Sequence, residues 1–350
     1  MRAVRWNAPE QLELVEADEP VAAAGQAVVE VATAGICGSD LHAYSHGFAA
    51  RPGQVLGHEF SGVVLDAPGV EGLAAGQRVT VRPLIPCGRC DRCAAGDPQL
   101  CESGHEQNIG YASPGAFAER VLIPRAVVDE TVFALPEAVD DRGGALVEPL
   151  AVGLRAVRRC GDVAGRTVLV LGAGMIGLAA TRFLKLAGAG TIVVTDPSAA
   201  RREAARALGA DVLLDPLRDS TLKAMRELTG PGAMGLGARV DAAIDCAGVA
   251  TAFADAVKCL RGGGTLVLAA IYARRIEFSP DRLTEKELVV RGSFAYRDEF
   301  PAVIEALASG DVEPERFVSH TFALGDAEAA FRAQLDKDAS LKVLLVPGQA

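Results

Sequence analysis

Four cysteines lie close together in the sequence, and their spacing is that of a metal site: Cys87, Cys90, Cys93 and Cys101. The segment that carries them is rich in glycine and charge, as expected of a compact loop. Four thiolates would close a tetrahedral shell around zinc and leave no open position, which is typical of a structural zinc site. An iron–sulfur cluster is the competing interpretation, because two-residue spacings also suit clusters. No proline follows Cys101, and this favours zinc.

A second set of potential ligands is dispersed along the chain. Cys37 lies in a Gly-Ile-Cys-Gly-Ser-Asp segment, His58 and Glu59 lie in Gly-His-Glu-Phe-Ser-Gly, and Glu148 lies in Val-Glu-Pro. One thiolate, one imidazole and carboxylates form a mixed set that suits a zinc ion with a position left for water or substrate. Taken singly, Cys37 or His58 reads more simply as a buried, hydrogen-bonded core residue. Together they predict a catalytic metal site.

The segment Val168 to Leu178 reads as an apolar strand, a Gly-x-Gly-x-x-Gly turn and the start of a helix. The first glycine allows a tight turn, the second lets the backbone approach a pyrophosphate, and the third lets the helix pack on the strand. Amide groups at the start of the helix would bind the phosphate charge. A structural turn in an unrelated α/β domain is the alternative. The expected cofactor contacts at this turn are Gly172, Gly174, Met175, Ile176 and Gly177.

A second apolar strand, 191–195, ends at Asp196, 19 residues after Gly177. An acidic residue at this place accepts hydrogen bonds from the adenosine ribose and repels a 2′-phosphate. Asp196 therefore favours NAD over NADP. Arg201 is a further candidate cofactor contact. Arg201 and Arg202 could bind a 2′-phosphate, which the carboxylate of Asp196 opposes, or they could be solvated charges on a helix.

The surrounding patterns indicate the elements that position these residues. Residues 1 to about 150 hold short β patterns separated by Gly/Pro turns, which predict a β-rich domain with long loops. The chain then alternates strands and helices, which predicts a doubly wound parallel sheet and an α/β fold class. The expected strands are 167–171, 191–195, 240–245, 265–270 and 287–290, the helices 175–188, 199–208 and 251–260, followed by helices at 298–309 and 325–337 and a strand at 341–346.

Composition excludes several classes of protein. Half of the 350 residues are hydrophobic, which is typical of an ordered globular chain. A formal net charge of −10 argues against nucleic acid or an anionic membrane as a partner. No apolar run is long enough to span a bilayer, and no signal peptide is evident, so we expect a cytoplasmic protein. In a reducing compartment the eight cysteines would not form a disulfide framework.

At the two cysteine-containing sites and the glycine turn the chain resembles the zinc-dependent medium-chain dehydrogenase/reductase family. The segments around Cys37 and His58 are most similar to its polyol group, which contains butanediol, sorbitol and threonine dehydrogenases. The resemblance covers essentially the whole chain. It implies a GroES-like catalytic domain formed by residues 1–150 and 292–350, a Rossmann NAD-binding domain at 151–291, and a homo-oligomer, a tetramer or a dimer.

The resemblance also implies roles for single residues. Cys37, His58 and Glu59 would be direct zinc ligands, and Glu148 is either a ligand or a partner through the zinc-bound water. Ser39 would hydrogen-bond the substrate oxygen, and His42 would relay the proton towards solvent. Their alternatives are a turn serine and a surface histidine. Asp40 would orient His58, with an N-terminal turn cap as the alternative. Tyr44 would line the substrate pocket or have a packing role. Arg297 and Tyr296 would face the polyol, with surface and core roles as the alternatives.

The expected function is NAD-dependent oxidation of a secondary alcohol in a diol or polyol to the ketone, with one catalytic and one structural zinc per chain. The residue chemistry alone supports only an alcohol; the polyol comes from the resemblance. L-Threonine 3-dehydrogenase and a general secondary alcohol dehydrogenase are the alternatives, and the former would need a pocket charge such as Arg297 for the substrate carboxylate. A non-catalytic protein that retains the fold is a third alternative, which the intact set of candidate residues opposes.

Overall fold

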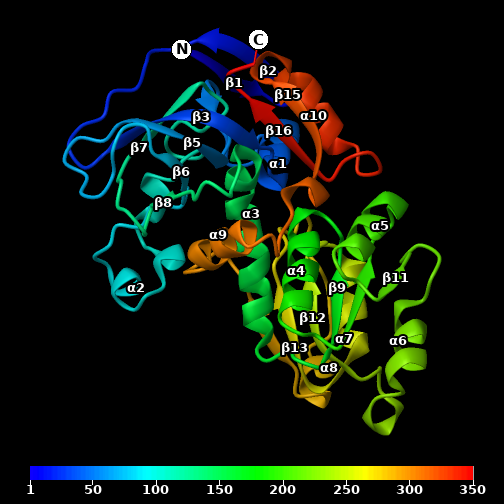
Figure 1. Cartoon of the computed structure of the whole chain (residues 1–350). Helices are drawn as coiled ribbons and strands as arrows, with labels where there is room; N and C mark the ends of the chain where they lie inside the picture. Colours follow the sequence, from blue (N-terminus) through cyan, green and yellow to red (C-terminus); the bar gives the residue numbers. More distant parts are fainter. Residues whose placement is uncertain (350) are drawn as a thin grey trace. The chain divides into compact units, whose positions relative to one another are not determined.

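The computed structural model describes residues 1–349 and divides into two compact units. One unit contains Met1–Glu148 together with the chain from Arg297 onwards, and the other contains Pro149–Tyr296 (Figure 1). The boundaries expected from the sequence, after residues 150 and 291, differ from these by two and five residues. Helix α3 (Asp141–Cys160) runs across the first boundary and carries Pro149 inside it.

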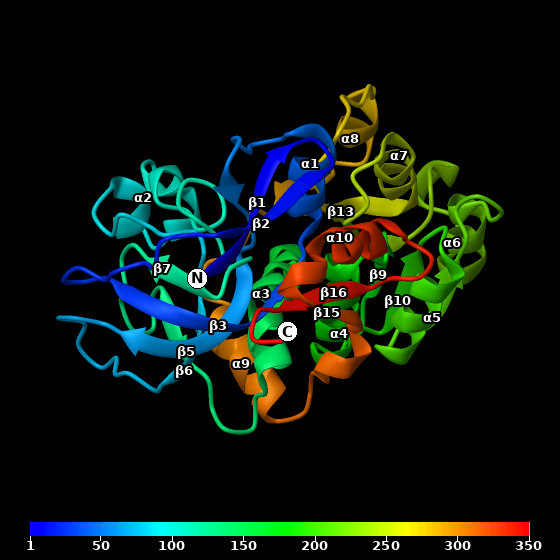
Figure 2. The ribbon, with the colours of Figure 1, turned by 90° about the horizontal axis from the view of Figure 1, so that it is seen from above.

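The first unit is β-rich and contains a seven-stranded sheet that places the candidate catalytic residues. Its order is β15-β16-β3-β5-β6-β8, with β7 also paired to β3, and a separate sheet has the order β2-β1-β4. The C-terminal strand β16 therefore lies beside β3, which comes from the start of the chain. Figure 2 shows these strands with α10 against β16. The strands are β1 (Arg2–Ala8), β2 (Gln11–Glu16), β3 (Ala27–Gly35), β4 (Gln54–Val55), β5 (Glu59–Asp66), β6 (Arg78–Val81), β7 (Arg120–Ile123), β8 (Val132–Ala134), β15 (Val318–Ala323) and β16 (Lys342–Val346).

The core of this unit explains why its central strands stay in place. Seven of the nine residues of β3 are buried, as expected of a strand covered on both faces. Phe60, Phe117 and Phe331 are almost completely inaccessible, and the last two rings meet edge to face at 5.7 Å. The helices around the sheets are α1 (Gly38–His46), α2 (Asp91–Ala94), α9 (Phe300–Ala308) and α10 (Ala327–Leu335).

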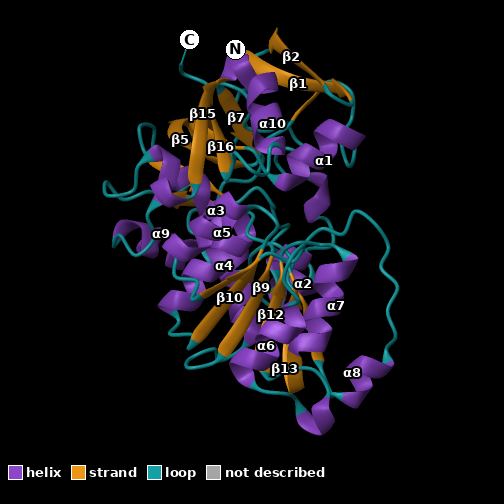
Figure 3. Cartoon of the chain, turned by 90° about the vertical axis from the view of Figure 1, so that its right-hand side faces the viewer, coloured by secondary structure: helices purple, strands orange, loops and turns teal. Residues whose placement is uncertain are grey.

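The second unit is a six-stranded sheet in which every pairing is parallel, with the order β11-β10-β9-β12-β13-β14. This is the strand order of a Rossmann fold, whose dinucleotide crevice lies where the order reverses, beyond the carboxyl ends of β9 and β12. Figure 3 shows the helices that surround this sheet. Its elements are β9 (Thr167–Leu171), α4 (Met175–Leu186), β10 (Thr191–Thr195), α5 (Ala199–Ala207), β11 (Val212–Leu214), α6 (Thr221–Thr229), β12 (Val240–Asp245), α7 (Ala250–Cys259), β13 (Leu260–Leu268), α8 (Asp281–Glu285) and β14 (Val289–Gly292).

The fold class predicted from the sequence is confirmed, and the differences are local. Helix α3, strand β11 and helix α6 were not expected, and β13 begins five residues earlier than expected. Within residues 1–349, no helix combines the length and the apolar character needed to cross a membrane.

Candidate active site, zinc lobe and nucleotide turn

The first candidate site is formed where strands β3 and β5 meet. Cys37 follows β3 and precedes α1, while His58 and Glu59 stand at the start of β5, which pairs with β3 through Gly35 and Glu59. One ligand atom from each of Cys37, His58 and Glu59 lies within 4.8 Å of the other two. Cys37 is half-buried, and the other two side chains are buried. A thiol, an imidazole and a carboxylate at this separation fit a zinc ion.

Asp40 connects two members of this group. Its Oδ2 accepts a hydrogen bond from the backbone N–H of Cys37 at 2.9 Å, and its Oδ1 lies 3.5 Å from Nδ1 of His58. Nδ1 of His58 is buried and makes no hydrogen bond. Burial alone would lower the pKa of His58, but the electrostatic effects of Tyr111, Asp40 and Cys37 outweigh burial and raise it well above its ordinary value. A buried imidazole beside a carboxylate is the arrangement that orients histidine ligands of metals.

Lys342 is a residue of this site that the sequence did not reveal. Its Nζ donates hydrogen bonds to both carboxylate oxygens of Glu59, at 2.6 and 2.9 Å, and to the carbonyl oxygen of Ile36 at 2.9 Å. Burial acts to lower the pKa of Lys342, but the charges of Glu59 and Cys37 reverse the effect and the pKa is raised. The sequence signal that could have revealed it is a lone lysine at the start of the apolar strand Lys-Val-Leu-Leu-Val. Charged side chains are rarely buried unless they are paired, so a lysine in such a strand indicates a buried partner of opposite charge.

Glu148 is buried within α3 and interacts electrostatically with His58, Glu59 and Lys342. It does not belong to the set of described residues whose ligand atoms lie within 4.8 Å of one another. Burial raises the pKa of this carboxyl group to about 8, although the charges of His58 and Lys342 act to lower it. Burial therefore makes this carboxyl group harder to ionise than an exposed glutamate.

The candidate relay residues follow Cys37 on α1. Ser39 and His42 are both half-buried, and the Ser39 hydroxyl forms a hydrogen bond of 2.8 Å with the phenol of Tyr111. Tyr111 was not singled out from the sequence. Tyr44, in contrast, is buried against Phe331 with ring centroids 5.0 Å apart, so it has the packing role that the sequence left open.

The two remaining pocket candidates are Arg297 and Tyr296, which belong to different units. Arg297 lies 3.4 Å from Asp97, next to the four-cysteine loop, and its carbonyl oxygen accepts a hydrogen bond from Arg82. Together with Cys93 it lines a cavity of about 470 Å³. Tyr296 is buried in the other unit.

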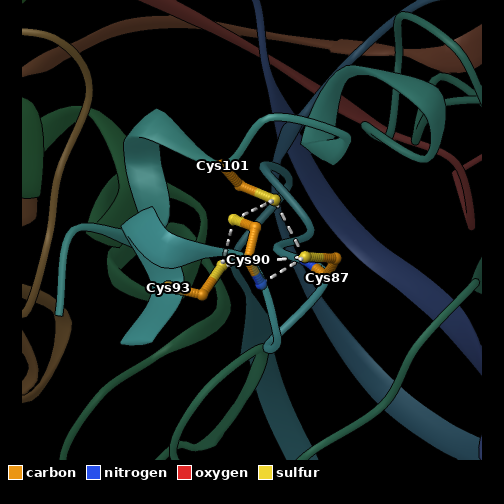
Figure 4. A group of neighbouring side chains, drawn as sticks. All are labelled: Cys87, Cys90, Cys93 and Cys101. Atoms are coloured by element: carbon orange, nitrogen blue, oxygen red, sulfur yellow. Dashed lines mark hydrogen bonds between the residues drawn. The ribbon is translucent and has the colours of Figure 1, made fainter. Parts of the chain in front are cut away.

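The four-cysteine lobe brings all four sulfur atoms together (Figure 4). The Sγ atoms of Cys90 lie 3.6 Å from Cys93 and 3.9 Å from Cys101, and those of Cys87 and Cys93 are 4.0 Å apart. Hydrogen bonds from the backbone N–H groups of Arg89 and Cys90 lower the pKa of Cys87 to about 6, whereas burial raises that of Cys93 to about 12. Four sulfur atoms facing one point fit a closed tetrahedral zinc shell.

The nucleotide turn has the close contacts that its glycines predict. A Cβ on Gly177 would lie 1.8 Å from the carbonyl oxygen of Gly172, and the φ angle of Gly172 is 92°, so neither position tolerates a side chain. Met175 and Ile176 are the first residues of α4, as expected.

Asp196, which directly follows strand β10, contacts this turn with its side chain. Its carboxylate is buried and accepts hydrogen bonds from the backbone N–H groups of Ala173 (2.8 Å) and Ser198 (2.9 Å). Two lone pairs of the carboxylate stay available for further donors. Arg202 binds the carbonyl oxygens of Asp196 and Pro197 and lies 3.4 Å from Asp215. Arg201 lies beside the turn, with Nη1 3.8 Å from the place of a Cβ on Gly174.

Two family models match the chain. The model described as alcohol dehydrogenase GroES-like domain matches residues 23–136, and the model described as zinc-binding dehydrogenase matches residues 176–309. The (R,R)-butanediol dehydrogenase of Bacillus subtilis strain 168 is 33% identical over 99% of this chain and 100% of its own length. The chain belongs to the zinc-dependent medium-chain dehydrogenase family. This confirms the resemblance predicted from the sequence, and the protein is an oxidoreductase.

Solved structures of relatives have the same fold over nearly the whole chain. A zinc-binding dehydrogenase from Sinorhizobium meliloti 1021 bound to NADP has a TM-score of 0.87 at 33% identity, with 99% of each chain covered. An alcohol dehydrogenase, rspB, from Escherichia coli CFT073 in complex with NADH has a TM-score of 0.89 at 31% identity, also with 99% of each chain covered. Zinc and a nicotinamide dinucleotide are therefore the cofactors of this family. The first of these two relatives holds NADP and the second holds NADH.

Proposed function

We propose that this protein catalyses the zinc- and NAD-dependent oxidation of a secondary alcohol in a diol or polyol to the ketone. The observation that carries the proposal is the mixed group Cys37, His58 and Glu59, whose ligand atoms lie within 4.8 Å of one another. The similarity to a butanediol dehydrogenase over the full chain supports a diol as the substrate class.

Cys37, His58 and Glu59 would hold the catalytic zinc, which as a Lewis acid lowers the pKa of a bound alcohol. Asp40 would orient both Cys37 and His58, since it accepts a hydrogen bond from the backbone N–H of Cys37 and lies 3.5 Å from Nδ1 of His58. Glu148 is not grouped with the three ligands and is proposed to act through water.

Two residues on α1 would handle the substrate oxygen and its proton. Ser39 would hydrogen-bond the substrate hydroxyl and accept its proton. His42, half-buried on the same helix, would pass that proton towards solvent, because an imidazole gains and loses a proton near neutral pH. Hydride transfer is the chemistry of the nicotinamide, and the protein contributes orientation.

A second zinc would be held by the four-cysteine lobe. Its four sulfur atoms leave no position for a substrate, so this ion would stabilise the loop and take no part in the reaction. The proposal therefore requires two zinc ions per chain.

We propose NAD as the natural cofactor. The contact that supports it is the buried carboxylate of Asp196, which has lone pairs for ribose hydroxyl groups and would repel a 2′-phosphate. Arg202 supports the same preference, since it already binds two carbonyl oxygens and lies beside Asp215. The binding site would be completed by Gly172, Gly174, Met175, Ile176, Gly177 and Arg201.

We further propose a homo-oligomer, a dimer or a tetramer, in the cytoplasm. Strand β14 ends the parallel sheet, and its Val289 and Val290 are 41% and 39% exposed. An edge strand with apolar side chains is a surface that another copy of the chain can cover. Light scattering of the purified protein measures the oligomer size directly.

The alternative of L-threonine 3-dehydrogenase is less well supported. It needs a cation for the substrate carboxylate, and the candidate, Arg297, is placed with Asp97 beside the four-cysteine loop. A general secondary alcohol dehydrogenase would use the same catalytic residues and differ only in its preference among alcohols.

The deciding experiment follows NAD reduction by absorbance across butanediol isomers, sorbitol, xylitol, threonine and simple secondary alcohols, with zinc measured on the same sample. Turnover of a diol or polyol with two zinc ions per chain is expected. Preferential turnover of threonine or of simple alcohols would select one of the alternatives. The absence of any NAD reduction by the zinc-loaded protein would refute the proposed class of reaction.

A further inference from the structure

Tyr111 is a polar side chain at the candidate active site for which the proposed mechanism has no use. It lies in the segment between the four-cysteine lobe and β7, far in sequence from α1. Its phenol oxygen nevertheless lies 2.8 Å from the hydroxyl oxygen of Ser39, the residue proposed to bind the substrate oxygen. The ring of Tyr111 also faces His58, with ring centroids 5.1 Å apart and planes tilted by 38°.

The position of Tyr111 is held by its backbone as well as by its ring. The side-chain amide of Gln54 donates hydrogen bonds to the carbonyl oxygens of Gly110 (2.8 Å) and Tyr111 (2.6 Å). The backbone N–H of Tyr111 donates to the carbonyl oxygen of Asn108 at 3.2 Å. The residue is only half-buried, so it is fixed without being sealed in the core. This is how a side chain that meets a ligand is expected to be arranged.

The hydroxyl groups of Ser39 and Tyr111 together can form more hydrogen bonds than a single substrate hydroxyl would require. Ser39 and Tyr111 each carry one O–H donor and acceptor lone pairs, and the bond between them uses one donor and one lone pair. One donor and several lone pairs therefore stay available on two neighbouring oxygen atoms. A diol or polyol presents two hydroxyl groups on adjacent carbon atoms, which also lie within hydrogen-bonding reach of each other.

We propose that Tyr111 binds the hydroxyl group next to the reacting carbon and thereby makes the enzyme prefer diols and polyols to simple secondary alcohols. In this arrangement Ser39 binds the oxygen that is oxidised, and Tyr111 binds its neighbour. A substrate without the second hydroxyl leaves Tyr111 without that partner, and a site built to bind a hydroxyl discriminates against the analogue that lacks it. The inference rests on the proposed function and assigns its specificity to one residue.

The test compares Tyr111→Phe with the wild-type enzyme on matched substrates. The variant keeps the ring against His58 and removes only the phenol oxygen. Each diol or polyol that the wild type oxidises is paired with the mono-alcohol of the same carbon skeleton: 2,3-butanediol with 2-butanol, xylitol with 2-pentanol, and sorbitol with 2-hexanol. We expect kcat/KM for the diol or polyol to fall about tenfold, the effect of one lost hydrogen bond, with the mono-alcohol changing less than about twofold.

A binding measurement separates recognition from turnover. Calorimetric titration of the same alcohols into enzyme saturated with NADH, where oxidation cannot proceed, should show the weaker affinity of Tyr111→Phe for the diol only. Zinc content and melting temperature are measured on the same samples. Tyr44→Phe is the matched control, because it removes a phenol oxygen from a ring packed on Phe331 in the core of the same unit.

The outcomes distinguish this inference from the proposed function. If Tyr111→Phe lowers kcat/KM equally for diol and mono-alcohol, or changes neither, Tyr111 does not set specificity and only the proposed function stands. If the wild type oxidises no diol or polyol, the proposed function itself fails. A lower diol preference in Tyr111→Phe, with unchanged zinc content and an unaffected Tyr44→Phe control, supports the assignment.

Discussion

Replacing Lys342 with methionine should destabilise the protein by about 3–5 kcal/mol, the usual cost of leaving one member of a buried ion pair without its partner. The side chains of Lys342 and Glu59 are 3% and 1% exposed, so water cannot take the place of the lost cation. Methionine keeps the length of the aliphatic chain and removes the three hydrogen bonds that Lys342 makes to Glu59 and Ile36. A loss of this size is a large part of the ordinary stability of a protein, about 5–15 kcal/mol.

Urea unfolding of the protein after removal of zinc by a chelator measures this loss, because a zinc ion bound to Glu59 would itself compensate the charge of the carboxylate. The chain has one tryptophan, Trp6, which is buried in the same unit as Lys342, so its fluorescence reports the unfolding of that unit. The transition midpoint should shift to lower urea with little change in slope. Lys342→Arg retains a cation and should lose less than Lys342→Met.

An exposed lysine provides the control. Lys223 lies 4.0 Å from Glu227, and both side chains are mostly exposed, so Lys223→Met should change the free energy of unfolding by less than about 1 kcal/mol. A loss of less than about 1 kcal/mol in Lys342→Met would refute the reasoning. It would mean that Glu59 does not depend on Lys342 for compensation of its charge.

Three further changes test the metal and cofactor assignments. Cys37→Ser should remove one of two zinc ions and the activity without changing the circular dichroism spectrum; a fully active variant would contradict the catalytic site. Asp196→Ala should shift the ratio of kcat/KM for NAD and NADP towards NADP by about tenfold or more, and an unchanged ratio would assign the preference to another residue. After chelation of zinc at pH 7, Cys87 should be alkylated faster than Cys93, because its pKa of about 6 leaves it mostly as thiolate. Its alkylation rate should rise through pH 6 and then level off, and peptide mass spectrometry that found equal rates for both would contradict this.

Elements with a strong local pattern could be predicted from the sequence. The expected strands 167–171, 191–195 and 240–245 have the same bounds as β9, β10 and β12, because buried parallel strands are continuous apolar runs between turns. Helix α3 was missed because Gly143, Gly144 and Pro149 are all helix-breaking residues. Packing overrides that preference at Gly144, where a Cβ would lie 2.5 Å from Leu135 and 2.6 Å from Ser61.

The candidate site also contains residues that the sequence could predict and residues that it could not. The cysteines and the Cys37–His58–Glu59 set could be found because each lies in a short motif with its own spacing. Lys342 and Tyr111 lie in no such motif, and each meets the site only through tertiary pairing. Lys342 arrives through the register of β16 with β3, and Tyr111 through a loop whose course no local pattern specifies.

The position of β16 also has a consequence for the synthesis of the protein. Lys342 is made 194 residues after Glu148, an interval of roughly 10–40 s at ordinary rates of translation. The unit Pro149–Tyr296 is continuous in sequence and can fold during that interval, because domains generally fold as units while the chain is being made. Until β16 arrives, one edge of β3 at Ala34 and Gly35 has no partner, and Glu59 has no buried cation. A chain whose synthesis stops after Tyr296 and before Lys342 would therefore contain the whole Pro149–Tyr296 unit but lack the strand that brings Lys342 to Glu59.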